Sequence, residues 1–462
     1  MSQAAVSSAT PSMGRARTAL ILLILINLFN YIDRQVLPAV LEAVEKSLLT
    51  DKEAKPTVET ESPTNGDPAP KEAESSHKTK LGLLQVAFMF SYFLCAPLFG
   101  WLADRMPRWK IIGVGVILWS LASGASGLAA TFTLLFLTRC AVGLGEAAYG
   151  PAAPTIISDL YPISVRGKVM SWFYVAIPVG SALGSVLGGQ VLSHTLGNEE
   201  GWRWELYLVM PPGILLGLWC FFMKEPARGQ ADRAGTPQKK ATWEDFRVLV
   251  RTPSYVLCTL GMTAMTFAMG GIAYWLPYYL IKVHGMEPKS ANSYFGLIVV
   301  LTGLFATLLG GILGDRLRKR FSGSYFLVSG IAMLVGFPLI ALVLVAKGPL
   351  LWVCISLACF ALFFNTGPTN TILANVTHPQ IRASAFAINI FVIHALGDAV
   401  SPAIIGAITD SYGTEQAQLE AGLRAGFLTM SAFVALGGIL WLWGMRYLAK
   451  DTAAVSGDIT PA

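Results

Sequence analysis

Apolar stretches of about 20 residues recur along nearly the whole chain, and this recurrence constrains the fold more than any other feature. A helix needs about 20 apolar residues to cross the hydrocarbon core of a bilayer. Hydrophobic residues make up 54% of the 462 residues and charged residues only 13%, about half the charged share of a soluble domain. We therefore predict an all-α polytopic membrane protein. The twelve predicted transmembrane helices cover residues 18–41, 81–103, 111–130, 132–153, 169–192, 204–223, 254–282, 291–314, 324–346, 349–374, 384–409 and 425–448.

Lysine and arginine are unevenly distributed between the predicted loops. If both termini are cytoplasmic, the inner tails and loops carry about twice as many Lys and Arg residues as the outer loops, as the positive-inside rule requires. We therefore expect both termini in the cytoplasm. Arg15 and Arg17 precede a first span that is too long for a cleaved signal peptide. The net charge of +6 follows from the same bias and does not indicate nucleic-acid binding.

Two hydrophilic segments interrupt the apolar pattern. Residues 42–80 are rich in Lys, Glu, Pro, Ser and Thr, a composition typical of a mobile outer loop. Residues 224–253 join the sixth predicted span to the seventh and are basic, as expected of a cytoplasmic linker. We therefore divide the chain into an N-terminal six-helix bundle (1–223), the linker, and a C-terminal six-helix bundle (254–462).

Two loop motifs occur in both halves of the chain. GWLADRMPRWK (100–110) matches GGILGDRLRKR (310–320), with Gly, three residues, Asp and Arg in common. DLYPISVRG (159–167) matches NVTHPQIRAS (375–384), with a Pro and then an Arg before the next helix. Motifs that repeat in the same order indicate a duplicated six-helix unit. The doubled pattern resembles the major facilitator superfamily, which implies two pseudo-symmetric six-helix bundles around a cavity that opens alternately to each side.

Charged residues inside the predicted spans mark the candidate site. A charge at the centre of an apolar helix costs about 3 kcal/mol on insertion scales, so each one is a functional hypothesis. Arg139, Gly143 and Glu146 share one helical face, and Asn27, Asn30, Tyr31 and Arg34 form a polar stripe at similar spacing. We expect both stripes to face the cavity. The candidate substrate-binding or proton-coupling residues are Asn30, Tyr31, Asp33, Arg34, Arg139, Glu146, His394 and Asp398.

The charges of Asp33, Arg34, Arg139 and Glu146 sum to zero, so these side chains can neutralise one another in an empty cavity. Protonation of Glu146 or Asp33 would leave a net positive site for an anionic head group. Arginine suits this role because its planar guanidinium binds carboxylate or phosphate through two hydrogen bonds. The alternative is a structural ion-pair cluster that holds the first and fourth spans together.

A second set of charges lies in the duplicated loops. By resemblance to the superfamily, these residues form an inner gate in which Asp sits at a helix end and Arg pairs across the bundle when the cytoplasmic side closes. The basic residues of these loops also suit a simpler role as topology anchors. The gating candidates are Asp104, Arg105, Arg108, Asp159, Arg166, Asp315 and Arg316.

Four segments narrow the resemblance: NYIDR (30–34), RCAVGLGEAAYGPAAPTIISDLYP (139–162), GWRW (201–204) and HALGDAVSP (394–402). Together they resemble the Spinster branch, whose members carry sphingolipid phosphates and lysophospholipids. We therefore expect a secondary active transporter of an anionic amphiphile in a bacterial inner membrane, with proton coupling through Glu146 or Asp33. The second half offers apolar surface for the chain of such a substrate. Candidates for that surface are Phe267, Met269, Tyr274, Trp275, Phe363 and Phe364, with Asn365, Thr366 and Asn370 as polar groups.

Other functions are compatible with the same residues. A small organic anion or sugar-acid carrier would use the same arginines, and a broad drug exporter is favoured by Gly180, Gly184 and Gly188, which also suit close helix packing. A non-transporting membrane receptor on a transporter fold belongs to a different class. An enzyme is not expected, because the sequence contains no nucleophile, metal or nucleotide motif. We expect no cofactor, no nucleic-acid partner, and a functional monomer that meets its substrate, protons and membrane lipids.

Overall fold

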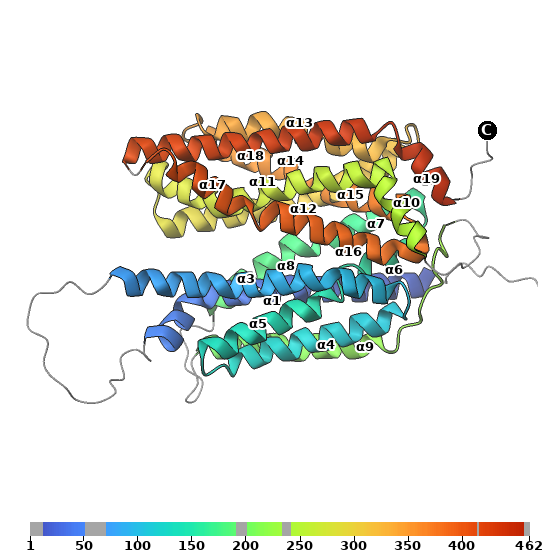
Figure 1. Cartoon of the computed structure of the whole chain (residues 1–462), viewed down its shortest axis with the longest axis horizontal. Coiled ribbons are helices and arrows are strands. Elements are labelled where there is room, and N and C mark those ends of the chain that lie inside the picture. The colour runs from blue at the N-terminus through green and yellow to red at the C-terminus, as the bar shows by residue number, and fades with distance from the viewer. Residues whose placement is uncertain (1–12, 51–70, 191–200, 233–241, 414, 457–462) are drawn as a thin grey trace, which may run out of the picture.

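The computed structural model describes residues 13–50, 71–190, 201–232, 242–413 and 415–456. All regular structure within these ranges is helical, and the helices lie side by side along the long axis of the molecule (Figure 1). The first group comprises α1 (Met13–Glu45), η1 (Lys46–Thr50), α3 (Lys71–Ala103), α4 (Arg108–Gly127), α5 (Phe132–Ala147), α6 (Ala153–Leu160), α7 (Ile163–Tyr174), α8 (Ala176–Gln190) and α9 (Gly201–Cys220). After α10 (Trp243–Arg251) come α11 (Pro253–His284), α12 (Pro288–Arg318), α13 (Ser324–Val343), α14 (Pro349–Phe363), α15 (Thr366–Val376), η2 (Pro379–Ile381), α16 (Arg382–Ile393), η3 (His394–Asp398), α17 (Ser401–Asp410), α18 (Gln416–Gly444) and α19 (Leu448–Ser456).

Nine helical segments of the described residues are long and apolar enough to cross a membrane. The predicted spans outside this set are 132–153, 169–192 and 204–223. The first two are each divided between two shorter helices, α5 with α6 and α7 with α8. The third, α9, carries Arg203 and Glu205 near its start. The all-helical membrane fold is confirmed, and the count of twelve spans stays a prediction.

The outward faces of the long helices are apolar. Leu94 and Leu98 of α3 are exposed, as are Leu301, Phe305 and Leu309 of α12. A spacing of four residues places such side chains on one face of a helix. Exposed apolar stripes of this length are unfavourable in water, whereas lipid tails are as apolar as leucine. These faces therefore suit contact with the bilayer.

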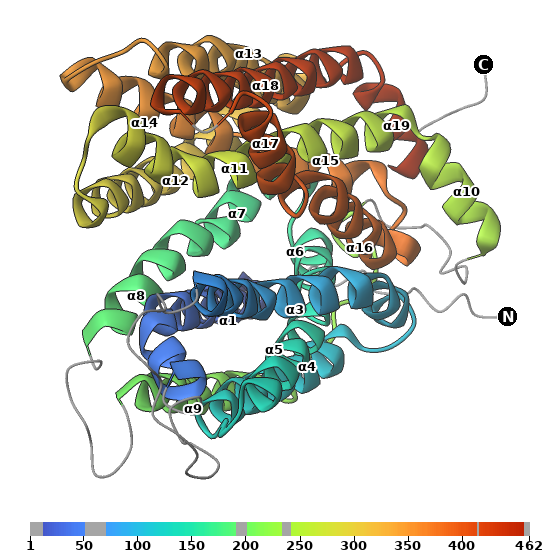
Figure 2. The same cartoon turned by 60° about the vertical axis from the view of Figure 1, so that its left-hand side comes forward.

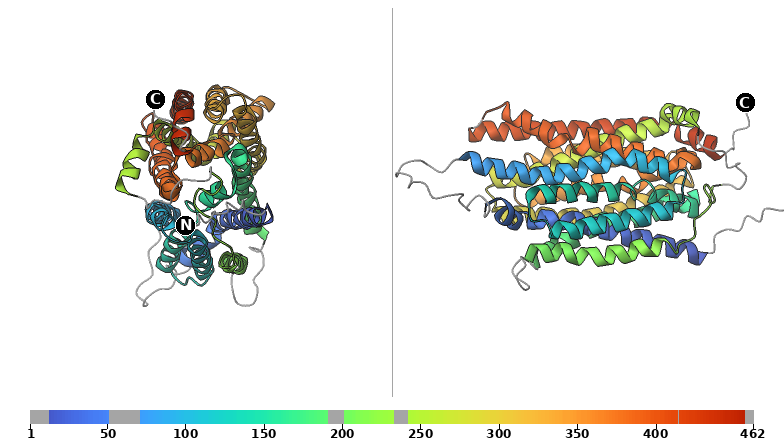
Figure 3. Two further views of the ribbon diagram at one scale, coloured as in Figure 1. Left: turned by 90° about the vertical axis from the view of Figure 1, so that its right-hand side faces the viewer. Right: turned by 60° about the horizontal axis from the view of Figure 1, so that its bottom comes forward.

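The helices form two groups, which we call the first half (α1–α9) and the second half (α11–α19). They are the lower and upper parts of Figure 1. The halves meet where α7 packs against α12 and α15, and where α16 packs against α3 (Figure 2). We call the end that carries α10 and α19 the linker end. It is on the right in Figure 1 and faces the viewer in the left panel of Figure 3.

Four of the predicted spans contain breaks in the helix among the described residues. α5 ends before α6 begins at Ala153, α7 and α8 meet at Val175, and two residues separate the end of α14 from the start of α15 at Thr366. The fourth span bends through η3, where Gly397 has φ −106° and ψ −107°. Non-helical backbone at membrane depth is tolerated where it is buried in protein or lines a cavity. All four breaks adjoin residues that line one cavity.

The first hydrophilic segment differs from its prediction as a loop over 42–80. α1 continues to Glu45, η1 extends to Thr50, and α3 begins at Lys71. Val44 and Leu48 are buried in an apolar cluster, which explains why the chain stays helical beyond the predicted first span. Residues 51–70 lie outside the described residues.

The spaced glycines of the fifth predicted span lie in α8 against α1. A Cβ atom on Gly180 would lie 2.6 Å from the carbonyl oxygen of Leu28, and one on Gly184 would lie 2.5 Å from that of Ile32. Both distances are too short for a real side chain. Glycine therefore lets the two backbones touch, as small residues do at membrane helix interfaces.

Candidate functional site

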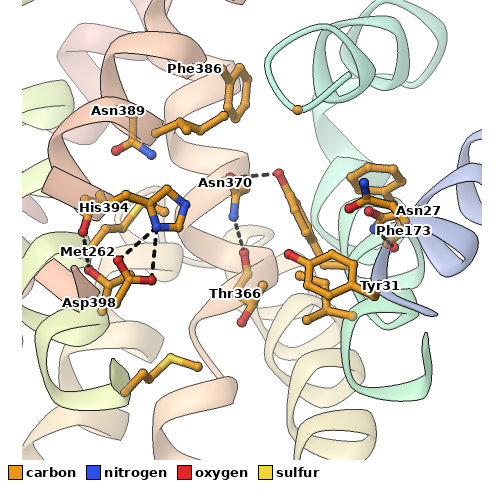
Figure 4. Close-up of a pocket in the computed structure, with 18 of the residues that line it drawn as sticks. Asn27, Tyr31, Phe173, Met262, Thr366, Asn370, Phe386, Asn389, His394 and Asp398 are labelled. Atoms are coloured by element: carbon orange, nitrogen blue, oxygen red, sulfur yellow. Dashed lines mark hydrogen bonds and ion pairs between the residues drawn. The ribbon is translucent and has the colours of Figure 1, made fainter. Parts of the chain in front are cut away.

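One cavity of about 250 Å³ lies between the two halves. The breaks in α5/α6 and α7/α8 open onto it from the first half, and those in α14/α15 and η3 from the second. Figure 4 shows Asn27, Tyr31 and Phe173 of the first half facing His394 and Asp398 of the second. Broken helices that surround a central site are typical of secondary transporters.

An ion pair on the first-half wall dominates the polar lining. The Nε and Nη2 atoms of Arg34 each lie 2.7 Å from Oε2 of Glu146. The Arg34 side chain is 15% exposed, whereas that of Glu146 is 1% exposed. The guanidinium carbon lies 4.9 Å from the ring centres of both Tyr31 and Tyr92, within the range of cation–π attraction. Oε1 of Glu146 has no partner among the described residues, so this carboxylate is only half satisfied.

Asp33 and Arg139 do not line the cavity. Asp33 is buried and accepts a hydrogen bond from Ser123 of α4. Arg139 is 1% exposed, and its Nε and Nη1 atoms have no partner among the described residues. The structure therefore differs from the expectation that Arg139 faces the cavity. The Arg139 guanidinium lies 5.4 Å from the centre of the Phe88 ring of α3, and α5 packs closely on α3 at Gly143, where a Cβ atom would lie 2.3 Å from the carbonyl oxygen of Phe88.

The second-half wall carries a second titratable pair. Nδ1 of His394 lies 2.9 Å and 3.0 Å from the two carboxylate oxygens of Asp398 (Figure 4). The ring of Tyr92 lies 5.6 Å from that of His394 in an edge-to-face contact. Because Tyr92 also contacts Arg34, it lies between the charged groups of the two halves.

Asn30 and Tyr31 both line the cavity, as the polar stripe predicted. Three tyrosines of the lining, Tyr92, Tyr149 and Tyr174, were not among the predicted site residues. Tyr174 donates a hydrogen bond of 2.9 Å to Asn370 across the halves. No sequence signal distinguishes such tyrosines from the aromatic residues that pack elsewhere in membrane helices.

The remainder of the second-half wall is largely apolar, with Met262, Met265 and Ile390 in its lining. Of the candidates for an apolar binding surface, Met269 and Phe363 also line the cavity, together with Thr366 and Asn370. The others lie elsewhere: Phe267 stacks on Phe433, Tyr274 is exposed, Trp275 donates to the carbonyl of Pro402, Asn365 donates to the carbonyl of Ala361, and Phe364 packs beside Gly310.

The duplicated aspartates make equivalent contacts across the halves at the linker end. The Asp104 carboxylate accepts hydrogen bonds of 2.9 Å and 2.8 Å from the backbone N–H groups of Ala383 and Ser384, in the first turn of α16. Asp315 accepts bonds of 3.1 Å and 2.8 Å from the N–H groups of Gly167 and Lys168 in α7. A carboxylate near a helix N-terminus is favourable because the N–H groups there carry positive partial charge. The repeat in the sequence therefore corresponds to a repeated contact.

A buried ionic cluster lies beside these contacts. Arg108 forms an ion pair with Asp159 inside the first half. Asp159 also lies 3.1 Å from Arg382 of the second half, and Arg166 donates a 2.6 Å hydrogen bond to Asn375. Arg382 was not predicted as a gating residue, although it is the counterpart of Arg166 in the repeated motif. These contacts join the two halves at the linker end, and we call this arrangement closed.

Two predicted gating residues lie outside this cluster. Arg105 is exposed and donates to the carbonyl of Trp101, and its guanidinium lies 4.2 Å from the centre of the Trp101 ring. Arg316 is exposed at the end of α12. Both follow an aspartate in the motif, so the helical turn directs them away from the interface that the aspartate faces.

The Asp104 contact predicts a pH dependence of the closed linker end. Burial raises the pKa of Asp104 to about 6, although the hydrogen bonds from Ser384 and Ala383 and the charge of Arg228 act in the opposite direction. When the halves separate, water would return this pKa to its ordinary value near 4. The closed arrangement then binds the proton more tightly than the open one. Lowering the pH from 7 to 5 should therefore raise the ratio of closed to open molecules by about tenfold. Distance measurements between the halves at several pH values would test this, and Asp104→Asn should abolish the dependence.

Comparison with known proteins places the chain in a family. Residues 23–402 match the sequence pattern of the Major Facilitator Superfamily. "Protein spinster homolog 3" of Danio rerio is 34% identical over 96% of this chain and 87% of its own length. The chain belongs to the Spinster family of the Major Facilitator Superfamily. The "Sphingosine-1-phosphate transporter SPNS2" of Danio rerio is 33% identical over 92% of this chain and 83% of its own length.

Solved structures agree on the fold. A bacterial homologue of the human lysosomal transporter Spinster, inward-facing and unoccupied, matches with a TM-score of 0.63 and 22% identity over 95% of this chain and 99% of its own. The proton:xylose symporter XylE matches with a TM-score of 0.72 and 16% identity over 95% and 99%. The major facilitator fold is thus shown. The Spinster-family chain is a multi-pass membrane transporter and not an enzyme.

Proposed function

We propose that this Spinster-family transporter couples proton movement to the transport of an anionic amphiphile, such as a lysophospholipid or a sphingoid phosphate. The observation that carries the proposal is the pair of Arg34 and Glu146 on the wall of the cavity between the halves. Arg34 is the binding group and Glu146 is its exchangeable partner. The linker end faces the cytoplasm of a bacterial cell, with the protein in the inner membrane.

The pair links proton binding to anion binding through competition for one guanidinium. While Glu146 is ionised, it occupies two donor atoms of Arg34. Protonation of Glu146 removes the negative charge that holds Arg34. The Arg34 guanidinium is then free to bind a phosphate or carboxylate group through two parallel hydrogen bonds. Arg139, buried nearby with unsatisfied donors, keeps positive charge behind the site throughout.

The shape and polarity of the cavity support an amphiphile. The Arg34–Glu146 pair lies on the first-half wall, whereas the second-half wall, apart from His394 and Asp398, has an apolar lining that includes Met262, Met265 and Phe363. The cavity volume of about 250 Å³ is below the 300–1,000 Å³ of most ligand pockets. It suits a head group and the start of a chain, whose remainder would extend between helices towards the bilayer.

Flux into proteoliposomes tests the substrate class. Arg34→Ala should reduce uptake of a labelled lysophospholipid or sphingoid phosphate by about 100-fold, since a charge-assisted bidentate contact is lost. Arg34→Lys should recover only part of the activity, because an ammonium group lacks the planar fork. The matched control is Arg424→Ala, which removes an exposed arginine paired with Glu420 and should leave uptake unchanged.

The alternatives give different results in the same assay. A small organic anion or sugar-acid carrier would transport short anions and ignore amphiphiles, yet would still need Arg34. A broad drug exporter would transport apolar cations and tolerate Arg34→Ala. A non-transporting receptor would bind without flux. Lysophospholipid uptake that is equal in the parent and in Arg34→Ala would refute the role proposed for Arg34.

A further inference from the structure

We propose that residues 225–232, which we call the strap, form a third component of the gate, and that Asp232 holds the two halves together at the linker end. The strap belongs to the segment that follows α9 and leads to the linker helix α10. Because it concerns the conformational cycle alone, the inference does not depend on the substrate or on proton coupling.

The strap is attached to the first half along most of its length. Oε1 of Glu225 lies 2.7 Å from Nε of Arg108, and Arg228 donates to the carbonyl oxygens of Ala103 and Met106. The backbone N–H of Gly229 donates a 2.8 Å hydrogen bond to Asp159. Gly229 has φ 72°, a left-handed conformation that glycine adopts without strain.

Asp232, at the end of the strap, bridges the halves. Its Oδ1 atom lies 2.7 Å from Nη2 of Arg166 in the first half, and its Oδ2 atom lies 2.7 Å from Nη2 of Arg382 in the second half. The two arginine side chains are 0% and 1% exposed. Burial alone would raise the pKa of Asp232, but Arg382 and Arg166 hold it at about 2. Asp232 is therefore ionised at any physiological pH.

The charge balance explains why this carboxylate matters. Arg166 and Arg382 approach each other across the interface and share one acid that comes from the strap. Removing one partner of a buried ion pair leaves an uncompensated charge, which is strongly destabilising. In the state open at this end, water would solvate both arginines. The loss of the Asp232 charge therefore penalises the closed state selectively.

The contacts of the strap indicate which interactions break when the linker end opens. Most described polar contacts of the strap are to the first half, so the strap stays with that half when the linker end opens. Arg382 then leaves both of its acids, Asp159 and Asp232. Arg382 is thus the residue that changes partners during the cycle.

The test measures the distance between the halves by electron paramagnetic resonance. Spin labels at Lys110 and Arg320, both exposed at the linker end, report closed and open populations in a background without the six native cysteines. Asp232→Asn should raise the ratio of open to closed molecules by about tenfold, because a buried charge loses its partner. Asp232→Glu should keep most of the closed population. The control, Glu244→Gln, removes an acid of the same linker that is 66% exposed and should change nothing.

Unchanged distances in Asp232→Asn would overturn the proposal. A second measurement keeps it testable if that variant fails to fold. Cysteines at Ala231 and Ala449, which line one cleft between the strap and α19, can be joined by a short bifunctional thiol reagent. The joined protein should stay in the closed population and lose transport until the link is cleaved. Opening of the joined protein would equally overturn the proposal.

Discussion

Glu146→Gln is expected to abolish accumulation driven by a pH gradient while exchange of substrate across the membrane continues. Glutamine has nearly the shape of glutamate but cannot take up a proton, so the competition for Arg34 no longer depends on pH. Gradient-driven accumulation should fall by about tenfold or more, as expected for a carboxylate in a proton relay inside a membrane protein. Uptake with and without an imposed pH gradient, measured beside counterflow at equal pH, provides the comparison.

Glu420→Gln is the matched control, because Glu420 pairs with Arg424 at the exposed start of α18. Its uptake should keep the pH response of the parent. Retained gradient-driven accumulation in Glu146→Gln would remove Glu146 from the coupling mechanism, whereas loss of both accumulation and counterflow would assign it to substrate binding.

Gly310→Val is expected to destabilise the second half severely. A Cβ atom on Gly310 would lie 1.9 Å from the carbonyl oxygen of Phe364, a backbone atom at the break between α14 and α15 that cannot move aside as a side chain can. Overpacking typically lowers the free energy of unfolding by about 1–3 kcal/mol. A clash with a backbone atom costs at least the upper end of this range, so we expect the free energy of unfolding to fall by about 3 kcal/mol. The melting temperature and the monodisperse fraction in detergent measure the effect.

Gly296→Val is the control on the same helix, because a Cβ atom there would meet nothing within 4 Å. It makes the identical chemical change in α12 without the clash. Its free energy of unfolding should stay within about 0.5 kcal/mol of that of the parent, as for most surface substitutions, so its melting temperature should be nearly unchanged. Equal melting temperatures for the two variants would contradict the close approach of α12 to the break.

Several elements of the site could be read from one-dimensional patterns. A membrane imposes its thickness on every span, so apolar stretches are visible without any knowledge of tertiary contacts. Ionisable groups within such stretches are costly, and this cost directed attention to Arg34, Glu146, His394 and Asp398, all of which line the cavity. Duplication was visible because its motifs repeat in order, and Asp104 and Asp315 make matching contacts.

Helical spacing could not decide which way a polar face points. Arg139 and Glu146 share a face, yet Glu146 lines the cavity and Arg139 lies against the Phe88 ring of α3. Asp33 likewise points to Ser123 in α4. Spacing determines which residues share a side of a helix, whereas the neighbouring helices determine what that side meets. The functional roles of all these residues stay predictions.

Hydropathy and intramembrane charge by themselves determined that this chain is a helical membrane protein with a charged site, because the bilayer acts on each segment separately, and the repeated loop motifs determined its duplicated architecture. Only the tertiary structure decided that Glu146 pairs with Arg34, that tyrosines line the same cavity, and that Asp232 joins Arg166 to Arg382. These contacts join residues far apart in the chain. Their energy depends on distance and burial after folding, which no local pattern records.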